Sequence, residues 1–583
     1  MRMKGFPEKF ISWIKACICD VPFSVCINGA LQGFFSSSAG LRQGCPLSPL
    51  LFAIVMDAFS CFLDSSSFLG IPLGSSSLKH LLYADDVLVF GLATIPNANE
   101  LAQILDNFAM ASGLHINNNK CSILFSKNLT IANDIMDILG FSAVDHTFKY
   151  LGLPISTKKL NSSHFQPLLS RISTLLAGWK VKFLSFAGRV QFLRFTIANT
   201  IAYWIRGAII PKSCCKSIDR MCSRFLFHGD KEGKKLHLIA WKDTCLPTCF
   251  GGLGIPDLAS LAHGFAGSFI WRFFNSSSLV FDWYRHRFTS PFKPAPHKCS
   301  KYWKFICGVA NKLKGHLNIT VNVDNCSKIS FYWDPWLNGT SLADIVPFSS
   351  ELLGPISMFW NSLWAVPEFL PLEVRHSIFA TSVRENSCGS ITWIGTEKPN
   401  FKVFRLNYFE GRQKVNWHHF IWHKRAALRF SSYSWLLIRG GLKLADILAR
   451  RNIFIDANCP LCRLVVGSVD VGLTGDSLLN FLREIIPLRI ILLLDGGFVG
   501  GVQTVRLGLA PPSFWLAVGY TAISCAAFGC MNILGLLRVH PAPLWCCSSL
   551  ATRENVATFS LGTGLMSFLA LMFVCPWAVS KAN

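Results

Sequence analysis

Two adjacent carboxylates, Asp85 and Asp86, interrupt the otherwise apolar stretch HLLYADDVLVF. Val87 and Val89 favour β-strand, so the stretch predicts a hairpin with the carboxylates at its tip. Paired carboxylates can hold hard divalent cations such as Mg²⁺, which neutralise phosphate oxygens during phosphoryl transfer. Two aspartates at a turn are also common as a solvated turn, so the pair alone leaves both interpretations open.

A second chemically equipped segment, GLRQGCPLSPLLF, precedes the hairpin. It combines the cation of Arg42, the amide of Gln43, flexible glycines, and prolines at the start of an apolar run. Such a segment can bring its backbone close to a nucleotide. An ordinary turn followed by a helix is the alternative interpretation.

Helices and strands predicted on either side would position these segments. FPEKFISWIKACICD predicts a helix, and FSVCINGALQGFF predicts a strand with a glycine turn. Helical spacing from Asn97 to Ala111 ends at Gly113, a good C-terminal cap. Beyond Tyr150 the apolar positions recur at helical spacing, so an α+β region precedes a helical one.

The charge of the chain indicates a polyanionic partner, with nucleic acid first and an anionic membrane surface second. The formal net charge is +23 over 583 residues, with a pI near 9.3. Residues 1–150 hold 9 basic and 11 acidic side chains, a net of −2, whereas residues 151–312 hold 24 and 6, a net of +18. Any nucleic-acid-binding surface should therefore lie mostly after residue 150.

Basic and aromatic side chains alternate in this middle region, which suits a groove that follows phosphates and stacks on bases. A solvated basic face over an aromatic core is the alternative. The residues concerned are Lys158, Lys159, Lys180, Lys182, Arg189, Arg194, Lys212, Lys216, Arg220, Arg224, Lys234 and Lys235, with Trp179, Phe183, Phe186, Trp204 and Phe225.

Four segments together resemble the reverse transcriptases of LINE-type non-LTR retrotransposons, especially the plant type. GLRQGCPLSPLLFAIVMDAFS is similar to the segment lining the template and nucleotide pocket, and LLYADDVLVF to the catalytic hairpin. SGLHINNNKC resembles the segment that supplies a lysine near the triphosphate, and KYLGLPI the primer-gripping hairpin. They occur in family order and spacing, and the likeness extends over most of residues 5–480.

The resemblance implies a role for each matching position. Asp85 and Asp86 would bind Mg²⁺ or Mn²⁺, and Lys120 would act near the triphosphate as an acid or charge stabiliser. The implied partners are an RNA template and a DNA primer. The nucleotide and template pocket would include Arg42, Gln43, Gly44, Pro46, Ser48 and Tyr83, and the primer grip Tyr150, Leu151 and Gly152.

The family's further catalytic aspartate, on a strand before the pocket segment, has no match here. RMKGFPEKFISWI resembles the helix just after that strand, and the context of Asp20, CICDVPFSV, does not match. We therefore expect an N-terminally truncated enzyme without polymerase activity. A misassigned start codon that hides an active polymerase, or a non-catalytic basic protein that binds RNA or DNA, are the alternatives.

The pair Cys459 and Cys462 has half the spacing of a tetrahedral zinc site. In the family a His and a Cys follow shortly downstream, whereas Val471 and Gly475 stand at about those positions here. We expect a degraded zinc-binding region with two reduced thiols rather than bound Zn²⁺.

The last part of the chain is poor in charge. Leu507–Leu537 and Asn555–Ser580 carry no charged residue and are each long enough to cross a bilayer, which takes about 20 residues. SFWLAVGYTAISCAAFGCMNILGLL faintly resembles the Trp-rich closing helix of the family, so a degraded core helix competes with a membrane anchor. The 22 scattered cysteines favour a reducing compartment, nuclear or cytoplasmic.

The expected fold class is α+β: a partial reverse-transcriptase palm, an antiparallel sheet with helices, followed by a helical thumb and a mostly helical C-terminal region. We expect five parts: a palm at 1–155, a basic helical thumb at 156–275, an irregular Trp-rich linker at 276–410, the degraded zinc-binding region at 411–480, and the apolar tail at 481–583.

Overall fold

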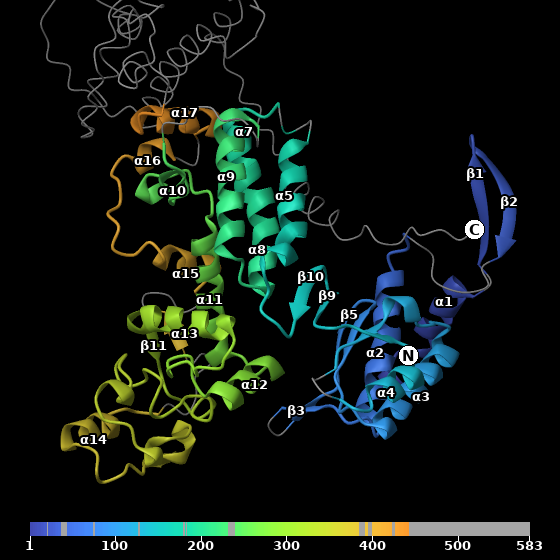
Figure 1. Cartoon of the computed structure of the whole chain (residues 1–583), viewed down its shortest axis with the longest axis horizontal. Helices are drawn as coiled ribbons and strands as arrows, with labels where there is room; N and C mark the ends of the chain where they lie inside the picture. Colours follow the sequence, from blue (N-terminus) through green and yellow to red (C-terminus); the bar gives the residue numbers. More distant parts are fainter. Residues whose placement is uncertain are drawn as a thin grey trace, which may run out of the picture.

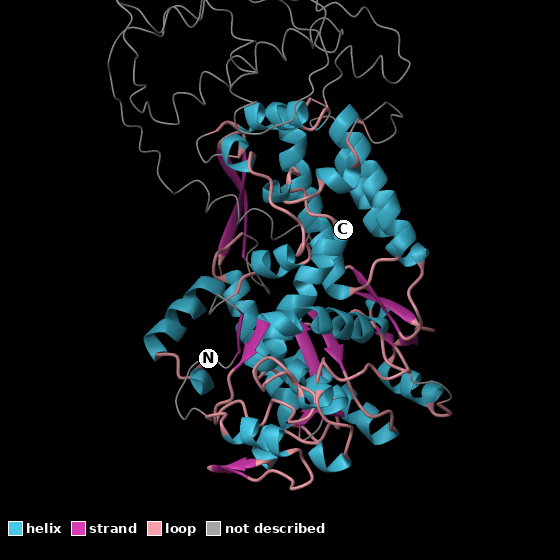
Figure 2. Ribbon diagram, turned by 90° about the vertical axis from the view of Figure 1, so that its left-hand side faces the viewer, coloured by secondary structure: helices cyan, strands magenta, loops and turns pink. Residues whose placement is uncertain are grey.

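The computed structural model describes residues 1–441 except 20, 37–43, 74–75, 126–128, 179–180, 182, 231–238, 384–390, 394–398 and 423–425. The apolar tail and the Cys459–Cys462 pair therefore lie outside the described residues. Helices predominate and the strands form short, separate pairs among them (Figure 2), so the fold is a mixture of helices and small, mostly antiparallel sheets.

The N-terminal unit, residues 1–156, is built around helices α2 and α3. Gly113 ends α3 at a φ of 71°, as the sequence predicts. The helix begins at Ile95, where Thr94 caps it by accepting a hydrogen bond from the Asn97 N–H. The elements are α1 (Glu8–Ile18), β1 (Pro22–Ile27), β2 (Ala30–Ser36), α2 (Ser48–Ser65), β3 (Ile71–Leu73), β4 (Ser76–Leu78), β5 (His80–Tyr83), β6 (Asp86–Val89), α3 (Ile95–Ser112), β7 (Ser122–Ile123), α4 (Ala132–Leu139), β8 (Ser142–Ala143), β9 (Thr147–Tyr150) and β10 (Leu153–Ser156).

The expected antiparallel sheet is a set of separate pairs. Every sheet in the described residues has two strands, and the β7–β8 pair is parallel. The predicted strand after α1 is itself a hairpin, because Asn28 and Gly29 both take positive φ angles, 51° and 87°, in a two-residue turn. The pair β5–β6 packs on the helices, with Leu82 and Val87 against the core that α2 and α3 form.

Helix α2 has the length and apolar composition of a membrane span, alone among the helices that the structure describes. Its buried residues Phe59 and Leu63 belong to the core of the N-terminal unit, where the Phe59 ring lies 4.9 Å from that of Phe108. One side of α2 therefore packs against α3, whereas apolar residues elsewhere on it, such as Leu50 and Phe62, are exposed.

The helical unit follows at residues 157–275. The helix α7, five π-helical residues Leu193–Ile197, and α8 run on as one helix, and their apolar side chains share one buried cluster with α5 and α9. The elements are α5 (Gln166–Ala177), α7 (Phe186–Phe192), α8 (Ala198–Gly207), α9 (Lys212–His228), α10 (Trp241–Thr244) and α11 (Leu258–Asn275).

Residues 276–410, the aromatic unit, contribute most of the largest hydrophobic cluster. Phe331, Tyr332 and Trp336 are buried on long loops, where helical or strand periodicity is weak, and Trp303 of α13 packs into the same cluster. Helix α11 joins this cluster to that of the helical unit, and α17 returns to the latter through Trp435. The elements from here on are α12 (Leu279–Phe288), α13 (Lys301–Leu313), β11 (Leu317–Ile319), β12 (Trp360–Asn361), β13 (Leu363–Trp364), α14 (Leu372–Phe379), β14 (Ile391–Trp393), α15 (Phe401–Asn407), α16 (His418–Ile421) and α17 (Leu428–Ile438).

Candidate functional site: two facing hairpins

The predicted acidic hairpin is present. Tyr83 of β5 pairs with Asp86 of β6, and Ala84 and Asp85 form the two-residue turn between them. Both aspartates are exposed. Ala84 takes a φ of 53°, in the left-handed region that a residue with a Cβ rarely adopts, and such local strain occurs often at functional sites.

The base of this hairpin is fastened to the end of α2. The Lys79 ammonium donates to the carbonyl oxygens of Leu63, Asp64 and Ser66 at 2.9, 3.0 and 3.1 Å. Leu63 and Asp64 lie in the last turn of α2, where carbonyls lack a backbone partner within the helix, and Ser66 is the residue that follows it. A cation here complements the negative end of the helix dipole. The acidic tip is thus carried by a strand pair whose position the helix determines.

A second contact between hairpin and helix involves a histidine. The Nε2 atom of His80 lies 2.6 Å from Ser60 Oγ, and its Nδ1 atom lies 3.7 Å from the Asp64 carboxylate. Ser60 and Asp64 are one helical turn apart on α2, so both ring nitrogens of His80 face the same helix.

A second hairpin is formed by β9 and β10. Leu151 and Gly152 form its turn, with φ angles of 49° and 76°, the pattern of a type I′ turn. Tyr150, Leu151 and Gly152, the three predicted primer-grip residues, therefore lie at its tip.

The two hairpin tips lie near each other. Burial raises the pKa of Tyr150, and the negative charge of Asp86 raises it further, so the two side chains are electrostatic neighbours. In Figure 1 the β9–β10 pair lies between the lower end of α8 and the strands of the N-terminal unit. Residues predicted separately for catalysis and for primer positioning are thus brought together.

Helix α8 completes the arrangement with a residue that the sequence did not single out. The Tyr203 hydroxyl donates a hydrogen bond to the Leu151 carbonyl oxygen, at the turn of the second hairpin. Burial raises the pKa of Tyr203, and Tyr83 of the acidic hairpin raises it further. One turn on, α8 approaches β10 so closely that a Cβ on Gly207 would lie 2.3 Å from Leu153 Cδ1.

A cationic pair lies just beyond the second hairpin. Lys301, the first residue of α13, and Lys159 are both exposed, and the charge of Lys159 lowers the pKa of Lys301. Two like charges held close together are a feature of sites that attract anions. Lys159 stood out in the sequence only as one of many basic residues, since the spacing does not indicate that Lys301 lies beside it.

The pocket segment is described in part. Gly44 has a φ of 82°, Pro46 lies in the turn, and Ser48 is the first residue of α2. Arg42 and Gln43 lie outside the described residues.

Lys120 ends a short 3₁₀ helix, Asn118–Lys120, and its side chain is exposed. Among the described residues it forms no ion pair or hydrogen bond with Asp85 or Asp86. Its predicted role near the triphosphate stays a prediction.

Comparisons with known proteins agree on one class. Residues 2–155 match the family described as reverse transcriptase (RNA-dependent DNA polymerase), and residues 402–470 match the family described as zinc-binding in reverse transcriptase. The chain therefore carries a reverse-transcriptase domain, and the resemblance to LINE-type non-LTR retrotransposon enzymes is confirmed: it is a retrotransposon-derived protein.

Two of the relatives carry the names of mobile elements, and a third is named as a mitochondrial protein. The transposon TX1 uncharacterized 149 kDa protein of Xenopus laevis is 28% identical, over 45% of this chain and 20% of the relative. A retrovirus-related Pol polyprotein from a type-1 retrotransposable element R2 of Popillia japonica is 32% identical, over 44% of this chain and 36% of the relative. An uncharacterized mitochondrial protein of Arabidopsis thaliana is 39% identical, over 12% of this chain and 62% of the relative. The chain thus spans less than two thirds of each.

Proposed function

We propose that this chain binds an RNA template paired with a DNA primer, and that the primer end lies between the β5–β6 and β9–β10 hairpins. In this proposal residues 1–155 act as the palm, residues 156–275 as the thumb, and residues 276–410 as a packed extension of the thumb. The observation that carries it is the approach of Tyr150 to Asp86, together with the hydrogen bond from Tyr203 to the Leu151 carbonyl. A primer end held by one hairpin would thereby face the carboxylates of the other.

The charge distribution supports a duplex that extends from the hairpins over the following helices. Residues 151–312 carry a net charge of +18, and the exposed pair Lys159–Lys301 lies just beyond the second hairpin. Lysines placed along a backbone release counterions from the phosphates, which makes binding strongly dependent on salt.

Asp85 and Asp86 suit a divalent metal ion. Both carboxylates are exposed at the hairpin tip, and carboxylate oxygens are the ligands that Mg²⁺ and Mn²⁺ prefer. A bound ion would supply charge neutralisation at the reacting phosphate. Tyr150 and Leu151 would orient the primer end, Gly44, Pro46, Ser48 and Tyr83 would shape the nucleotide and template pocket, and Lys120 would reach the triphosphate.

We further propose that this chain alone binds template–primer without extending it. Two-metal phosphoryl transfer uses carboxylates from more than one element, and the hairpin supplies two neighbouring ones. In the part of the chain that the structure describes, no three His, Cys, Asp or Glu side chains are grouped as metal ligands. Extension would then require a further acidic ligand from another segment or chain.

Zinc binding by Cys459 and Cys462 stays a separate hypothesis. The match to the zinc-binding family covers both cysteines, but they lie outside the described residues. A complete tetrahedral site needs two more ligands.

The binding proposal is tested by fluorescence anisotropy with a labelled RNA–DNA hybrid over a series of salt concentrations. Replacing Lys159 and Lys301 by alanine should weaken binding and reduce the slope of log affinity against log salt by about 2, since two phosphate contacts are lost. The matched control is Lys402→Ala, which removes an exposed lysine of α15. Affinity that does not fall with salt, or an equal loss in the control, would contradict the proposal.

The activity proposal is tested by primer extension on an RNA template with Mg²⁺ or Mn²⁺. We expect no extended product from the wild-type chain, and template–primer affinity within about twofold of wild type for Asp85→Ala/Asp86→Ala in metal-free buffer. Extension by the wild type that disappears in the double variant would show that the chain supplies a complete metal site.

A further inference from the structure

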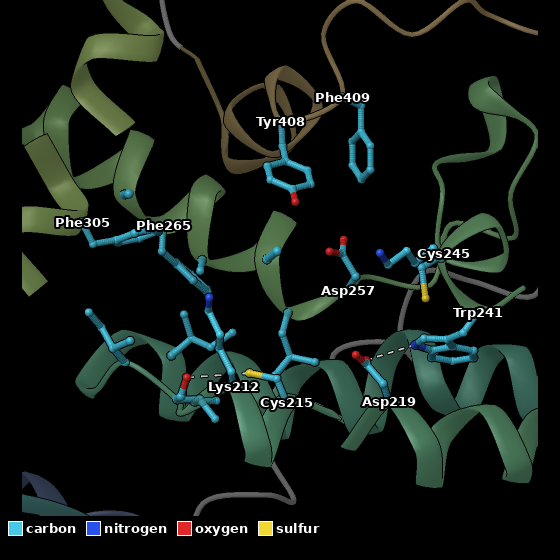
Figure 3. A pocket seen from close by; sticks show the side chains of 18 of the residues that line it. Lys212, Cys215, Asp219, Trp241, Cys245, Asp257, Phe265, Phe305, Tyr408 and Phe409 are labelled. Carbon is cyan, nitrogen blue, oxygen red and sulfur yellow. Dashed lines mark hydrogen bonds between the residues drawn. The ribbon is translucent and has the colours of Figure 1, made fainter. Parts of the chain in front are cut away.

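A cavity of about 650 Å³ lies at the junction of the helical and aromatic units. Its walls come from the end of α8, the starts of α9 and α11, the short helix α10, and α13, with residues 408–412 above (Figure 3). This volume is within the usual range for small-ligand sites, roughly 300–1,000 Å³. No residue of the two facing hairpins lines it.

Aromatic rings enclose much of this space. Phe265 and Phe305 lie at one end, Trp241 at the other, and Tyr408 and Phe409 reach in from the opposite side (Figure 3). Planar apolar walls of this kind suit a flat ring system, and unpaired nucleobases commonly stack on such side chains.

A carboxylate points into the cavity. The Oδ2 atom of Asp257 accepts a hydrogen bond from the Ser260 N–H at 3.2 Å and so caps α11. Its Oδ1 atom is buried and has no hydrogen-bond partner among the described residues. Figure 3 shows this carboxyl group directed toward Tyr408 and Phe409. A buried acceptor without a partner is costly. A small rotation of the carboxylate would bring Oδ1 to the cavity wall, where a hydrogen-bond donor on a ligand would remove that cost.

Other charged groups around Asp257 leave this acceptor available. Asp219 accepts a hydrogen bond from Trp241 Nε1 at 3.0 Å, and burial raises its pKa. Burial lowers the pKa of Arg405 and the charge of Asp257 counteracts this, yet the two side chains form no salt bridge within 4.0 Å in the described part of the chain.

The rim of the cavity has the opposite charge. Lys212, Lys242 and Arg412 line it and are exposed to solvent. A cationic ligand would have to pass these three groups, whereas an anionic group on the ligand would meet them at the opening. The cavity thus has a hydrogen-bond acceptor in its interior and cations at its opening. These features favour a ligand whose flat ring donates hydrogen bonds and which carries a phosphate group.

We propose that this cavity binds a guanine nucleotide. Guanine presents two neighbouring donors, the ring N1–H and the 2-amino group, that match the two oxygens of a carboxylate such as Asp257. Its ring would stack between the aromatic walls, and its phosphate would meet Lys212, Lys242 and Arg412. The same chemistry is offered by a free nucleotide and by an unpaired guanosine in RNA. The site is separate from the template–primer site and does not depend on it.

Isothermal titration of the full chain with nucleoside monophosphates tests the proposal. GMP should bind, and inosine monophosphate, which lacks only the 2-amino group, should bind about tenfold more weakly because one charge-assisted hydrogen bond is lost. AMP should bind more weakly still. Guanosine, which has no phosphate, should bind more weakly than GMP, since it offers no anionic group to the cations at the rim.

The matched variant is Asp257→Asn. Asparagine caps helices as well as aspartate does, so α11 should stay intact, as an unchanged thermal unfolding curve would verify. GMP affinity should fall about tenfold or more and the preference for GMP over inosine monophosphate should disappear, while template–primer affinity should stay unchanged.

Two further binding measurements show whether the guanine comes from a free nucleotide or from RNA, and whether a polyamine is the better ligand. An RNA hairpin with one unpaired guanosine, compared with its inosine counterpart, shows whether RNA is the preferred source. Equal affinity for GMP, inosine monophosphate and AMP, tighter binding of the polyamine spermidine than of GMP, or an unaffected Asp257→Asn variant would each overturn the proposal. Loss of template–primer binding with GMP binding retained would instead contradict the function proposed above.

Discussion

At the scale of single residues, the aspartate of the sequence YWDPW shows how a role follows from burial. Asp334 is fully buried and accepts hydrogen bonds from the Ser290 hydroxyl and, at 2.6 Å, from the Ser330 N–H. Burial raises its pKa to about 7, although both hydrogen bonds act to lower it. Its environment therefore favours the protonated form at mildly acidic pH.

This raised pKa predicts a pH-dependent stability. Between about pH 4 and pH 7 the folded carboxyl keeps a proton that the unfolded chain has released, so the free energy of unfolding should fall as pH rises through that window. Asp334→Asn should remove this slope. It should also lower stability by about 1–3 kcal/mol, since one amide oxygen replaces two carboxylate acceptors.

Urea unfolding followed by tryptophan fluorescence at several pH values between 4 and 8 measures both effects. Asp324→Asn is the matched control, because Asp324 is an exposed aspartate of the same unit. A slope that persists in Asp334→Asn, or disappears in Asp324→Asn, would assign the pH dependence to another group.

Some residue roles could be predicted from the sequence and others could not. The carboxylates Asp85 and Asp86 interrupt an apolar strand pattern, which is a local signal. Tyr203 carries no such signal, because its importance comes from a hydrogen bond to Leu151, 52 residues away. Spacing along a helix does not specify which distant turn that helix meets.

At the scale of elements, helix and turn signals were the most informative. The α3 helix has regular apolar spacing and a terminal glycine, and both are visible in the sequence. The Asn28–Gly29 turn is equally recognisable, whereas the turn at Leu151 and Gly152 is not, because leucine rarely adopts a positive φ.

In the Leu151–Gly152 turn, substitutions at the two neighbouring positions should change the stability of the protein in opposite directions. Leu151→Asn should stabilise the protein by about 0.5–1 kcal/mol, because asparagine tolerates the left-handed conformation better. Gly152→Ala should destabilise it by about 1 kcal/mol through backbone strain alone, since no atom lies within 4 Å of the added Cβ.

Thermal unfolding of the two variants provides the measurement. Template–primer affinity measured alongside shows whether the Leu151 side chain also contacts the primer. Destabilisation by Leu151→Asn comparable to that by Gly152→Ala would contradict the type I′ assignment of the turn.

At the scale of the whole molecule, the aromatic unit was the hardest part to anticipate. Its residues suggested an irregular linker because most of them lack periodicity, yet Phe331, Tyr332 and Trp336 are buried in the largest cluster of the described chain. Packing through loops and 3₁₀ turns leaves no 3.6-residue or two-residue pattern to read. The continuity of α11 between two clusters is likewise a tertiary property.

The proposed function requires that the two hairpin tips enclose a primer end. Tyr83 and Asp86 belong to one hairpin, Tyr150 and Leu151 to the other, and Tyr203 holds the second turn against α8. Residues of both the N-terminal and the helical unit form this arrangement. A measurement of where the primer end binds therefore tests the long-range fold as well as the function.

Photo-crosslinking measures most directly where the 3′ end of a bound primer lies on the chain. A DNA primer that carries 4-thiothymidine at its 3′ end is annealed to an RNA template, bound to the full chain and irradiated, and the linked peptides are identified by mass spectrometry. The account predicts linkage within residues 80–89 and 147–156, reduced by Tyr203→Phe. Linkage confined to other parts of the chain, with neither hairpin labelled, would contradict it.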